Sequence, residues 1–297
     1  MRKRLVAALA EMTPHEGPNT TFLKNVTLVR ISEHRARVPL LYDQSMCLAA
    51  QGHKVCHLPH AELTYGEKDL LVIPTVVPVE IDLCPEDGVP LLSLTLSIDL
   101  TTIQELLTQM KGVAGFDEQQ LSPPGLYLEP LTEEIVDATA RLLDVLRTQE
   151  QAEVLGPGII RELHYYLLRG AQGHQLAAAA CGDTSYARIS RVLRRIHDDY
   201  AKPLDVAELA GLANMSQRAF YSHFKAVTSL APVQYVKKIR LEKARKSIAV
   251  LGAGVGAAAR SVGYESPSQF SREFKRHFGY APRDAVLYSA VLDGAKP

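Results

Sequence analysis

The sequence predicts a multidomain α+β protein, in which a strand-rich N-terminal part precedes an all-helical C-terminal part. Three observations support this fold class: short β-branched runs with even turn spacing, a pattern that occurs twice between Asp205 and Arg283, and opposite net charges in the two parts. With 297 residues, the chain is long enough to form two hydrophobic cores.

The N-terminal part predicts a small antiparallel sandwich or barrel. Residues 1–20 are expected to form a helical arm and then a loop, because Pro14, Gly17 and Pro18 break regular structure. Short strand-like runs separated by Gly and Pro follow, as expected for a sandwich or barrel. A barrel of this size can hold one small ligand. The runs are Val26 to Ile31, Pro39 to Leu48, Lys54 to Leu58, Leu70 to Thr75, Val77 to Leu83 and Leu91 to Ile98.

Helices are expected after the strands. Asp99 is the predicted N-cap of a helix from Thr101 to Lys111, and two further helices are predicted at 132–148 and 159–169. Gly156-Pro157-Gly158 is expected to break the chain between these two. Small and polar residues then predict a linker. The predicted domains are residues 1–172, a linker at 173–185, and a helical domain at 186–290.

The two later helices each carry an apolar stripe. Ile135, Thr139, Leu142 and Leu146 align in the first, and Ile160, Leu163 and Leu167 align in the second. Such stripes suit the pairing of two chains into a homodimer, and they equally suit packing on the barrel.

The C-terminal part contains an internal repeat. The first copy reads VAELA and then Ser216, Phe220, Phe224 and Lys225. In the second copy, the residues that correspond to VAELA lie 49 positions further along the chain, and those from Ser266 on lie 50 positions further. Each copy is a short apolar helix, a turn and a second helix with a polar outer face. The repeat therefore predicts two helix-turn-helix units, the second with a turn one residue longer.

Charge is divided between the two parts. Residues 1–184 contain 14 Lys and Arg against 24 Asp and Glu, whereas residues 185–297 contain 19 against 9. A basic module attached to an acidic domain indicates a nucleic-acid partner for the C-terminal part, because basic surfaces release the counterions of nucleic acid.

Four motifs of the C-terminal part stand together: VAELA, the Ser216…Phe220-x3-Phe224-Lys225 core, IRLEKAR in the linking helix and VGYESPSQFSREFKRHFGYAPRD. On these motifs, residues 185–290 resemble the AraC family of bacterial transcription regulators. The resemblance implies a seven-helix DNA-binding domain whose two motifs are joined by a long helix. Residues 20–170 resemble the N-terminal domain of an AraC-type subgroup, notably at Gly158 to Leu168, which implies a cupin-like barrel followed by dimerisation helices.

The second motif departs from the family pattern in its first helix. Ala258 stands where the family usually has a large apolar residue, and Gly256 and Ala257 stand where it usually has polar ones. We therefore expect this helix to pack loosely and the second half-site to be read with less rigidity.

The family match and the helical period together indicate residues for DNA contact. Phe220 and Phe224 lie four residues apart and must face a core, as must Phe270 and Phe274, so the other faces are open to DNA. The arginines suit guanine and Gln269 suits adenine, because each side chain can form two hydrogen bonds with that base. The predicted base-reading residues are Arg218, Tyr221, Ser222, Ser268, Gln269, Ser271 and Arg272. The predicted backbone contacts are Gln217, Lys225, Lys237, Lys238 and Lys275, although exposed basic side chains are also commonly only solvated.

The N-terminal part offers weaker candidates for chemistry. Residues His53 to His60 form the one histidine cluster, but no HxH pair occurs, and on a strand Cys56 faces away from His53 and His57. We therefore predict no metal and no cofactor. Cys47, Cys56, Cys84 and Cys181 contain no CxxC pair and are expected to be reduced. Of these, Cys47, Cys56 and Cys84 are expected to be small buried apolar residues, with a thiol sensor as the alternative.

These patterns favour a cytoplasmic, non-enzymatic regulator that binds double-stranded DNA in two adjacent major grooves and senses a small molecule. A membrane partner is not expected, because no segment reaches the ~18–20 apolar residues that span a bilayer. RNA polymerase is a candidate partner. A second hypothesis is a cupin-type enzyme with a DNA-binding tail, and a third is a regulator controlled by abundance or a protein partner. The effector, the operator and the direction of regulation are not encoded in recognisable motifs.

Overall fold

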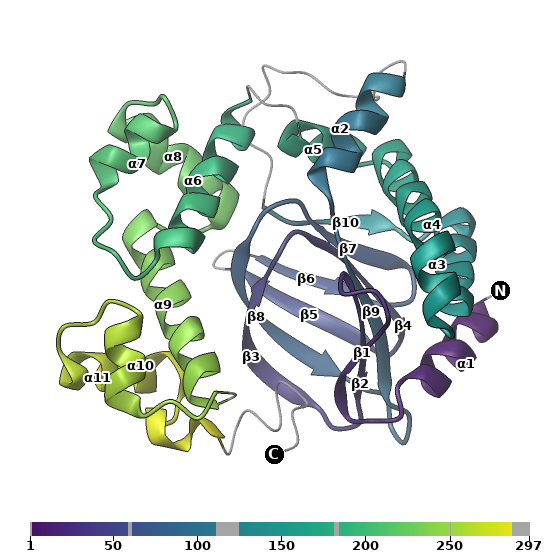
Figure 1. The fold of residues 1–297 in the computed structure, drawn as a ribbon, viewed down its shortest axis with the longest axis horizontal. Helices are drawn as coiled ribbons and strands as arrows, with labels where there is room; N and C mark the ends of the chain where they lie inside the picture. Colours follow the sequence, from purple (N-terminus) through teal and green to yellow (C-terminus); the bar gives the residue numbers. More distant parts are fainter. Residues whose placement is uncertain (1, 59–60, 111–124, 181–183, 250, 287–297) are drawn as a thin grey trace.

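The computed structural model describes residues 2–58, 61–110, 125–180, 184–249 and 251–286. Within these ranges, the N-terminal part has two antiparallel sheets with helices packed beside them, and the C-terminal part is helical (Figure 1). The multidomain α+β class, with a barrel-like N-terminal domain and an all-α C-terminal domain, is confirmed.

Ten strands in the described residues form the two sheets. The larger sheet has the order β1-β2-β9-β4-β7-β10, and the smaller has the order β3-β8-β5-β6. All pairs of neighbouring strands are antiparallel. The strands are β1 (Gly17–Thr20), β2 (Val26–Ile31), β3 (Arg35–Tyr42), β4 (Ser45–Gln51), β5 (His53–Leu58), β6 (Ala61–Tyr65), β7 (Asp69–Ile73), β8 (Val77–Cys84), β9 (Leu91–Ser97) and β10 (Tyr127–Pro130).

The larger sheet is buried on both faces. Along β4, Met46 and Leu48 contact the core beneath the helices, while Cys47 and Ala49 face the smaller sheet. Successive side chains of a strand point to opposite faces, so a strand covered on both sides reads as an unbroken apolar run. The space between the two sheets is the barrel interior.

Five helices cover the outer face of the larger sheet and share its core. Three of them begin at a side-chain cap: Asp99, Thr132 and Thr148 each accept a hydrogen bond from a backbone N–H two or three residues later. The predicted cap at Asp99 is therefore confirmed. The helices are α1 (Arg2–Met12), α2 (Leu100–Gln109), α3 (Glu133–Val145), α4 (Gln149–Arg169) and α5 (Gly173–Ala180).

The strand predictions need three corrections. The run from Pro39 to Leu48 is two strands, β3 and β4, because the chain turns at residues 43–44. Residues 17–20, predicted as loop, form β1 and pair with β2. Strands β6 and β10 were not predicted, and β6 explains why: it lies at a sheet edge with mostly exposed side chains, so it has no apolar run.

The predicted break at Gly156-Pro157-Gly158 is wrong, because α4 continues through all three residues. A proline removes the N–H that would bond to the carbonyl of residue i−4, here Glu153. Both Glu153 and Pro157 are exposed, so water can satisfy that carbonyl. Gly156 packs closely on Leu23: a Cβ there would lie 2.7 Å from Cδ1 of Leu23, whose side chain would have to move.

The segment predicted as a linker is structured over its first half. Residues Gly173–Ala180 form α5, and Leu176, Ala177 and Ala180 are buried in the core of the N-terminal domain. Cys181 and the rest of 181–183 lie outside the described residues, and α6 begins at Ser185. The division into domains at these boundaries stays a prediction.

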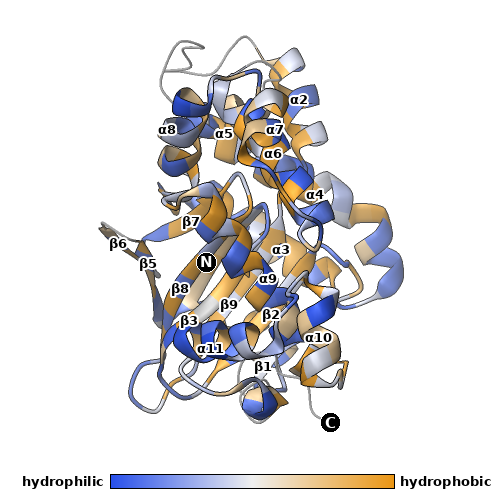
Figure 2. Cartoon of the chain, turned by 90° about the vertical axis from the view of Figure 1, so that its left-hand side faces the viewer, coloured by the Kyte–Doolittle hydropathy of each residue, from blue (hydrophilic) through white to orange (hydrophobic). Residues whose placement is uncertain are grey.

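The C-terminal part has six α-helices and one 3₁₀ helix within residues 184–286. They are α6 (Ser185–Asp199), α7 (Val206–Leu212), α8 (Gln217–Thr228), α9 (Pro232–Ala249), α10 (Val255–Ser261), α11 (Pro267–Phe278) and η1 (Pro282–Asp284). Helix α9 contributes to two separate cores. Tyr235 and Ile239 pack with α6, α7 and α8, whereas Leu241 and Ile248 pack with α10 and α11. Figure 2 shows apolar residues concentrated in barrel strands such as β8 and β9, and polar ones on α11.

Candidate nucleic-acid interface

Helix α8 is held by two phenylalanines and capped by a serine. Phe220 and Phe224 are fully buried, with ring centroids 5.4 Å apart, and the Ser216 side chain accepts a hydrogen bond from the N–H of Ala219. This packing leaves the opposite face of the helix exposed. The residues on that face are the predicted Gln217, Arg218, Tyr221, Ser222 and Lys225.

Helix α11 repeats this construction. Ser266 caps it by accepting from the N–H of Gln269, Pro267 occupies its first turn, and Phe270 and Phe274 are fully buried. Of the predicted residues, Ser268, Gln269, Arg272 and Lys275 are exposed and Ser271 is half-buried. The structure therefore groups the predicted reading residues on the outer faces of two matching helices.

The two turns differ by one residue, as predicted. Asn214 and Gly263, 49 positions apart, both have positive φ, and the next residue of each bonds through its N–H to the first helix of its unit. Gly263 must be glycine, because a Cβ would lie 2.3 Å from the carbonyl oxygen of Ala201. The additional residue in the second unit is Glu265, just before the capping serine.

A carboxylate on α11 connects this helix to α9. Glu273 accepts hydrogen bonds from Gln269 Nε2 at 3.1 Å, Lys237 Nζ at 3.1 Å and the hydroxyl of Tyr264 at 2.9 Å. Burial raises the pKa of Glu273, but the three donors outweigh it and the pKa lies below its usual value. Lys237, which was predicted to contact the DNA backbone, is thus paired within the protein. The amide nitrogen of Gln269 is likewise hydrogen-bonded to Glu273.

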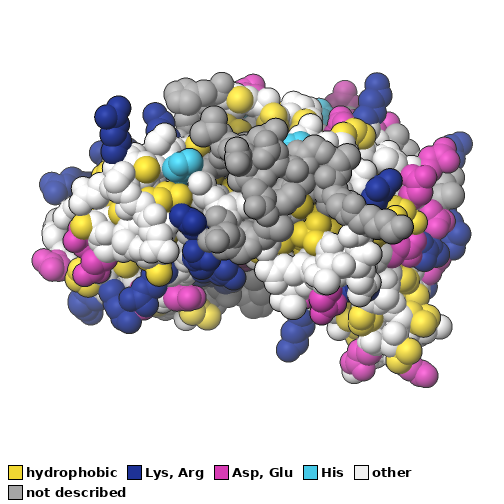
Figure 3. All heavy atoms as spheres, turned by 90° about the horizontal axis from the view of Figure 1, so that it is seen from above, with side chains coloured by type: hydrophobic (Ala, Val, Ile, Leu, Met, Phe, Trp, Pro, Cys, Tyr) yellow, Lys and Arg dark blue, Asp and Glu magenta, His cyan; other side chains and the backbone are white. Residues whose placement is uncertain are grey.

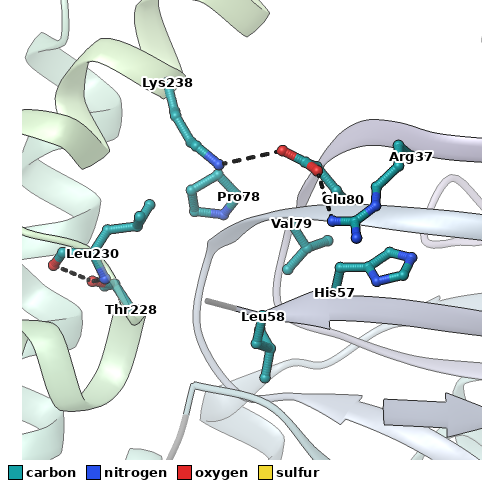
Figure 4. A pocket seen from close by; sticks show the side chains of 9 residues that line it. All are labelled: Arg37, His57, Leu58, Pro78, Val79, Glu80, Thr228, Leu230 and Lys238. Carbon is teal, nitrogen blue, oxygen red and sulfur yellow. Dashed lines mark hydrogen bonds and ion pairs between the residues drawn. The ribbon is translucent and has the colours of Figure 1, made fainter. Parts of the chain in front are cut away.

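Lys238 is turned toward the barrel. Its Nζ lies 3.9 Å from Oε1 of Glu80 on β8, and the other oxygen of Glu80 accepts from Arg37 at 3.4 Å (Figure 4). In this arrangement of the domains, the amine of Lys238 is paired with a carboxylate of the barrel. Lys238, Glu80 and Arg37 line a pocket of ≈ 140 Å³ between the barrel strands β3, β5 and β8 and the helices α8 and α9. The other lining residues are His57, Leu58, Pro78, Val79, Thr228 and Leu230.

Two hydrogen bonds join helices α8 and α9 to the N-terminal part of the chain. The hydroxyl of Tyr235 donates to the carbonyl of Val76 at 2.9 Å and lies 3.0 Å from Nε2 of His197. The N–H of Gly125 donates to the carbonyl of Val227, at the end of α8, at 2.9 Å. Sequence reasoning missed this junction, because its partners lie far apart in the chain.

The barrel interior holds polar side chains among apolar ones. The hydroxyls of Tyr42 and Tyr65 lie 3.1 Å apart, and the buried Lys54 amine lies over the Tyr65 ring, 5.9 Å from its centroid. Burial raises the pKa of the Cys56 thiol to about 12 and also raises that of Cys84, so both are protonated at neutral pH. A thiol that stays protonated is a poor nucleophile, which disfavours the thiol-sensor alternative at these two positions.

Within the histidine cluster, His57 is paired with two carboxylates. The ring of His57 lies 2.8 Å from Glu62 and 2.9 Å from Asp82, while His60 lies outside the described residues. No group of three or more His, Cys, Asp and Glu in the described part of the chain could hold a metal ion.

The apolar stripes of α3 and α4 pack within the chain. Ile135, Leu142, Leu163 and Leu167 are all buried in the core shared with the larger sheet. The alternative of packing on the barrel therefore accounts for both stripes. A different face of α4 is open, where Val154 is 71% exposed and Leu155 is 51% exposed.

Two family models match the chain. One, described as the AraC-type transcriptional regulator N-terminus, matches residues 23–175, just over half of the chain, and the other, a helix-turn-helix domain, matches residues 209–286. The chain belongs to the AraC family of transcriptional regulators. The resemblance found in the sequence is thereby confirmed for both parts.

Curated relatives match mainly the C-terminal part. A probable transcriptional regulator, LumQ of Photobacterium leiognathi, is 36% identical over 87 residues, which cover 29% of this chain and 35% of that protein. The transcriptional activator RhaS of Klebsiella pneumoniae is 31% identical over 98 residues, which cover 33% of this chain and 35% of that protein. The matched stretch thus spans about a third of the length of each relative.

Solved structures of ToxT from Vibrio cholerae share the fold over the whole chain. ToxT with a bound unsaturated fatty acid has a TM-score of 0.61 and 14% identity, covering 95% of this chain and 99% of that one. The apo K231A variant of ToxT has a TM-score of 0.61 and 13% identity, covering 92% and 98%. Among the described residues, no helix combines the length and the apolar character needed to cross a membrane.

Proposed function

We propose that this chain is a sequence-specific, DNA-binding transcription regulator whose activity depends on a small molecule bound by the N-terminal domain. The observation that carries the proposal is the pair of capped helices α8 and α11, each with a buried phenylalanine pair on one face and exposed polar residues on the other. A helix of this kind presents its N-terminal turns to the major groove.

The two reading helices are proposed to enter successive major grooves of one DNA duplex. Arg218, Tyr221 and Ser222 of α8 and Ser268, Gln269, Ser271 and Arg272 of α11 would contact bases, with Gln217, Lys225 and Lys275 on the phosphates. Lys and Arg side chains gather over the C-terminal helices on the left of Figure 3, whereas more Asp and Glu lie at the other end. This distribution supports electrostatic attraction of DNA to the C-terminal part.

The effector is proposed to be a carboxylate-bearing small molecule that enters the pocket between the barrel and α9. Two cations, Arg37 and Lys238, converge there on the single carboxylate of Glu80, so a ligand carboxylate could take its place. The bound fatty acid in ToxT, which shares the fold, supports a role for an acid ligand.

Ligand control would follow from the position of this pocket. Because its walls come from both the barrel and α8–α9, a ligand there would have different affinity for different domain arrangements. A ligand shifts such an equilibrium only through this difference.

The proposal also covers the oligomeric state, the location and the partners of the protein. The exposed Val154 and Leu155 of α4 support a homodimer, which sedimentation of wild type beside a Leu155→Glu variant would test. The family supports a cytoplasmic location and a non-enzymatic role, with RNA polymerase as a candidate partner to which no residue is assigned.

The proposal is tested by footprinting of the full-length protein on its own upstream DNA over a salt series, with and without oleate as a probe acid. Wild type should protect two adjacent major grooves. Arg218→Ala and Arg272→Ala should each weaken protection of one groove by about 1–3 kcal/mol.

Arg169→Ala, an exposed arginine at the end of α4, serves as the matched control and should leave the footprint unchanged. Binding that is equally tight to all DNA sequences and insensitive to salt would refute the proposed function. A footprint that is the same with and without oleate would refute a fatty-acid effector and leave the proposed DNA-binding function standing.

A further inference from the structure

The carboxylate of Glu273 is the starting point for an inference about base recognition. Its side chain is only 12% exposed although it lies on the recognition helix α11. It accepts three hydrogen bonds: Gln269 and Lys237 donate to Oε1, and Tyr264 donates to Oε2. Because the pKa of Glu273 is lowered, the group is ionised at neutral pH and can only accept.

This chemistry fixes the orientation of the Gln269 side chain. An amide has one end that donates and one that accepts, and a carboxylate acceptor can face only the donating NH2. The Nε2 of Gln269 is therefore turned toward Glu273, one helical turn further along α11. The carbonyl oxygen of Gln269 then points away, and no described residue donates a hydrogen bond to it.

Gln269 occupies the third position of α11, directly after Ser266, Pro267 and Ser268, and is exposed. Residues in this N-terminal turn of a recognition helix are those that reach base edges. In the major groove the amino groups of adenine N6 and cytosine N4 donate, whereas thymine O4 and guanine O6 accept. An oriented carbonyl oxygen distinguishes these two classes.

We propose that Glu273 is a positioning residue for DNA sequence recognition: it orients Gln269 so that this side chain accepts a hydrogen bond from adenine or cytosine. The inference rests on the proposed DNA-binding function and deepens it. It replaces the expectation that Gln269 selects adenine alone with a preference for the two bases whose amino groups donate in the major groove.

Glu273 has a second effect through Lys237. The carboxylate neutralises this lysine, whose side chain is 36% exposed, and ties it to α11. Lys237 is thereby withheld from the DNA phosphates. Removing the negative charge of Glu273 should release it for one additional phosphate contact.

The first helix-turn-helix unit has no such arrangement. The residues of α8 that correspond to Gln269 and Glu273 are Ala219 and His223, and Ala219 has no amide to orient. The oriented acceptor is thus a property of the second unit alone.

The test is selection of binding sites from a randomised duplex library by the full-length protein, for wild type, Gln269→Ala, Glu273→Gln and Tyr264→Phe. Gln269→Ala identifies the position that Gln269 reads, because preference is lost there. Wild type should prefer adenine or cytosine at that position by on the order of 2- to 10-fold, as for one net hydrogen bond.

Glu273→Gln should abolish this preference, because a glutamine at 273 can donate as well as accept and no longer fixes the amide of Gln269. It should also steepen the dependence of log affinity on log salt by about one unit, through release of Lys237. Tyr264→Phe should keep the preference, because Tyr264 contacts only Oε2.

The outcomes separate this inference from the function on which it rests. Selection of no sequence by wild type would refute the proposed function and the inference together. A selected site with guanine or thymine at the Gln269 position, or an unchanged preference in Glu273→Gln, would refute the inference alone. Circular dichroism checks that each variant is folded. If Glu273→Gln is unfolded, comparison of wild type with Gln269→Ala still tests the inference, because it shows which base is preferred at the position that Gln269 reads.

Discussion

The two helix-turn-helix units have the same helix order and different surroundings. The core of the first, around Phe220, Phe224 and Tyr235, extends to Leu41 and Leu100 of the N-terminal domain. The core of the second, around Phe270 and Phe274, is built in the described structure only from residues between Tyr200 and Ala285. Within the described residues, the core of the first unit therefore includes side chains of the N-terminal domain, and the core of the second does not.

This difference indicates how a signal would travel. A change in the barrel can act on the first unit directly, through Val76 and Gly125, which bond to Tyr235 and to the end of α8. Among the described residues, it reaches the second unit less directly, through α9 and through the end of α6 at Tyr200. We therefore expect the effector to change binding at the first half-site more than at the second, and four predictions test the comparison.

The largest expected effect is truncation of a buried phenylalanine. Phe274→Ala should lower the stability of the second unit by about 3–5 kcal/mol, because it leaves a cavity in the core of that unit. Footprinting should show loss of the second half-site, while urea unfolding of the N-terminal domain stays as in wild type. Phe224→Ala is the matched variant, and it should also destabilise the N-terminal domain. Equal effects of the two variants on the barrel would contradict the comparison.

The next largest effect is expected from acid, which should lower the free energy of unfolding. Of the two units, the first should be affected more, because His197 on α6 contacts Tyr235 in its core. Burial lowers the pKa of His197 to about 4, with a smaller lowering effect from Lys243, whereas an unfolded histidine titrates near 6.5. Between these values the unfolded chain binds more protons, so the free energy of unfolding falls as pH drops from about 6.5 to about 4, and not further below. The expected loss from His197 alone is on the order of 2–3 kcal/mol.

Urea unfolding at pH 7 and pH 4.5 measures this loss. Burial also lowers the pKa of His164 to about 4, so that residue acts in the same window. His197→Gln should therefore remove about half of the pH dependence. If the stability of His197→Gln depended on pH as strongly as that of wild type, protonation of His197 would not be a cause of the acid destabilisation.

A smaller effect is expected from Tyr235→Phe. It removes the hydroxyl that bonds to Val76 and lies next to His197, at a cost of about 1–2 kcal/mol. Hydrogen exchange should speed up at the end of α8 and not in α11. Tyr264→Phe, which removes a hydroxyl within the second unit, is the control and should produce the opposite pattern.

The smallest expected effect concerns the caps of the first helices. Asp205 caps α7 through the N–H of Ala207, whereas Gly254 at the start of α10 makes no side-chain cap. The backbone of Gly254 is extended, and a Cβ there would meet nothing within 4 Å. Gly254→Ser should stabilise the second unit by a few tenths of a kcal/mol, measured by thermal unfolding. Destabilisation would mean that α10 is not the weakly capped element described here.

Features determined by nearby residues were predictable from the sequence. The caps at Asp99, Ser216 and Ser266, the buried phenylalanine pairs and the longer second turn all depend on spacings of a few residues. The prediction of a break at Pro157 was wrong because the sequence pattern does not show that Glu153 and Pro157 lie on the exposed side of α4, where water can bond to the Glu153 carbonyl.

Features determined by contacts across the chain were not predictable. Lys237 and Lys238 are adjacent and equally basic, yet the fold pairs one with Glu273 and the other with Glu80. The linker prediction failed in the same way, because the small residues of α5 show their role only against the barrel core. The spacing of four between Gln269 and Glu273 was the one local signal of the α11 network.

Helix α9 has a consequence for the DNA that the protein can recognise. It is one uninterrupted helix of 18 residues, about 27 Å long, and each end belongs to the core of one unit. It thus sets both the separation and the relative rotation of α8 and α11. B-DNA completes a turn in about 10–10.5 base pairs, so one inserted base pair would rotate a half-site by roughly 35°. The chain would measure the helical phase of its operator, and a spacer of the wrong length would be rejected even when every contacted base is correct.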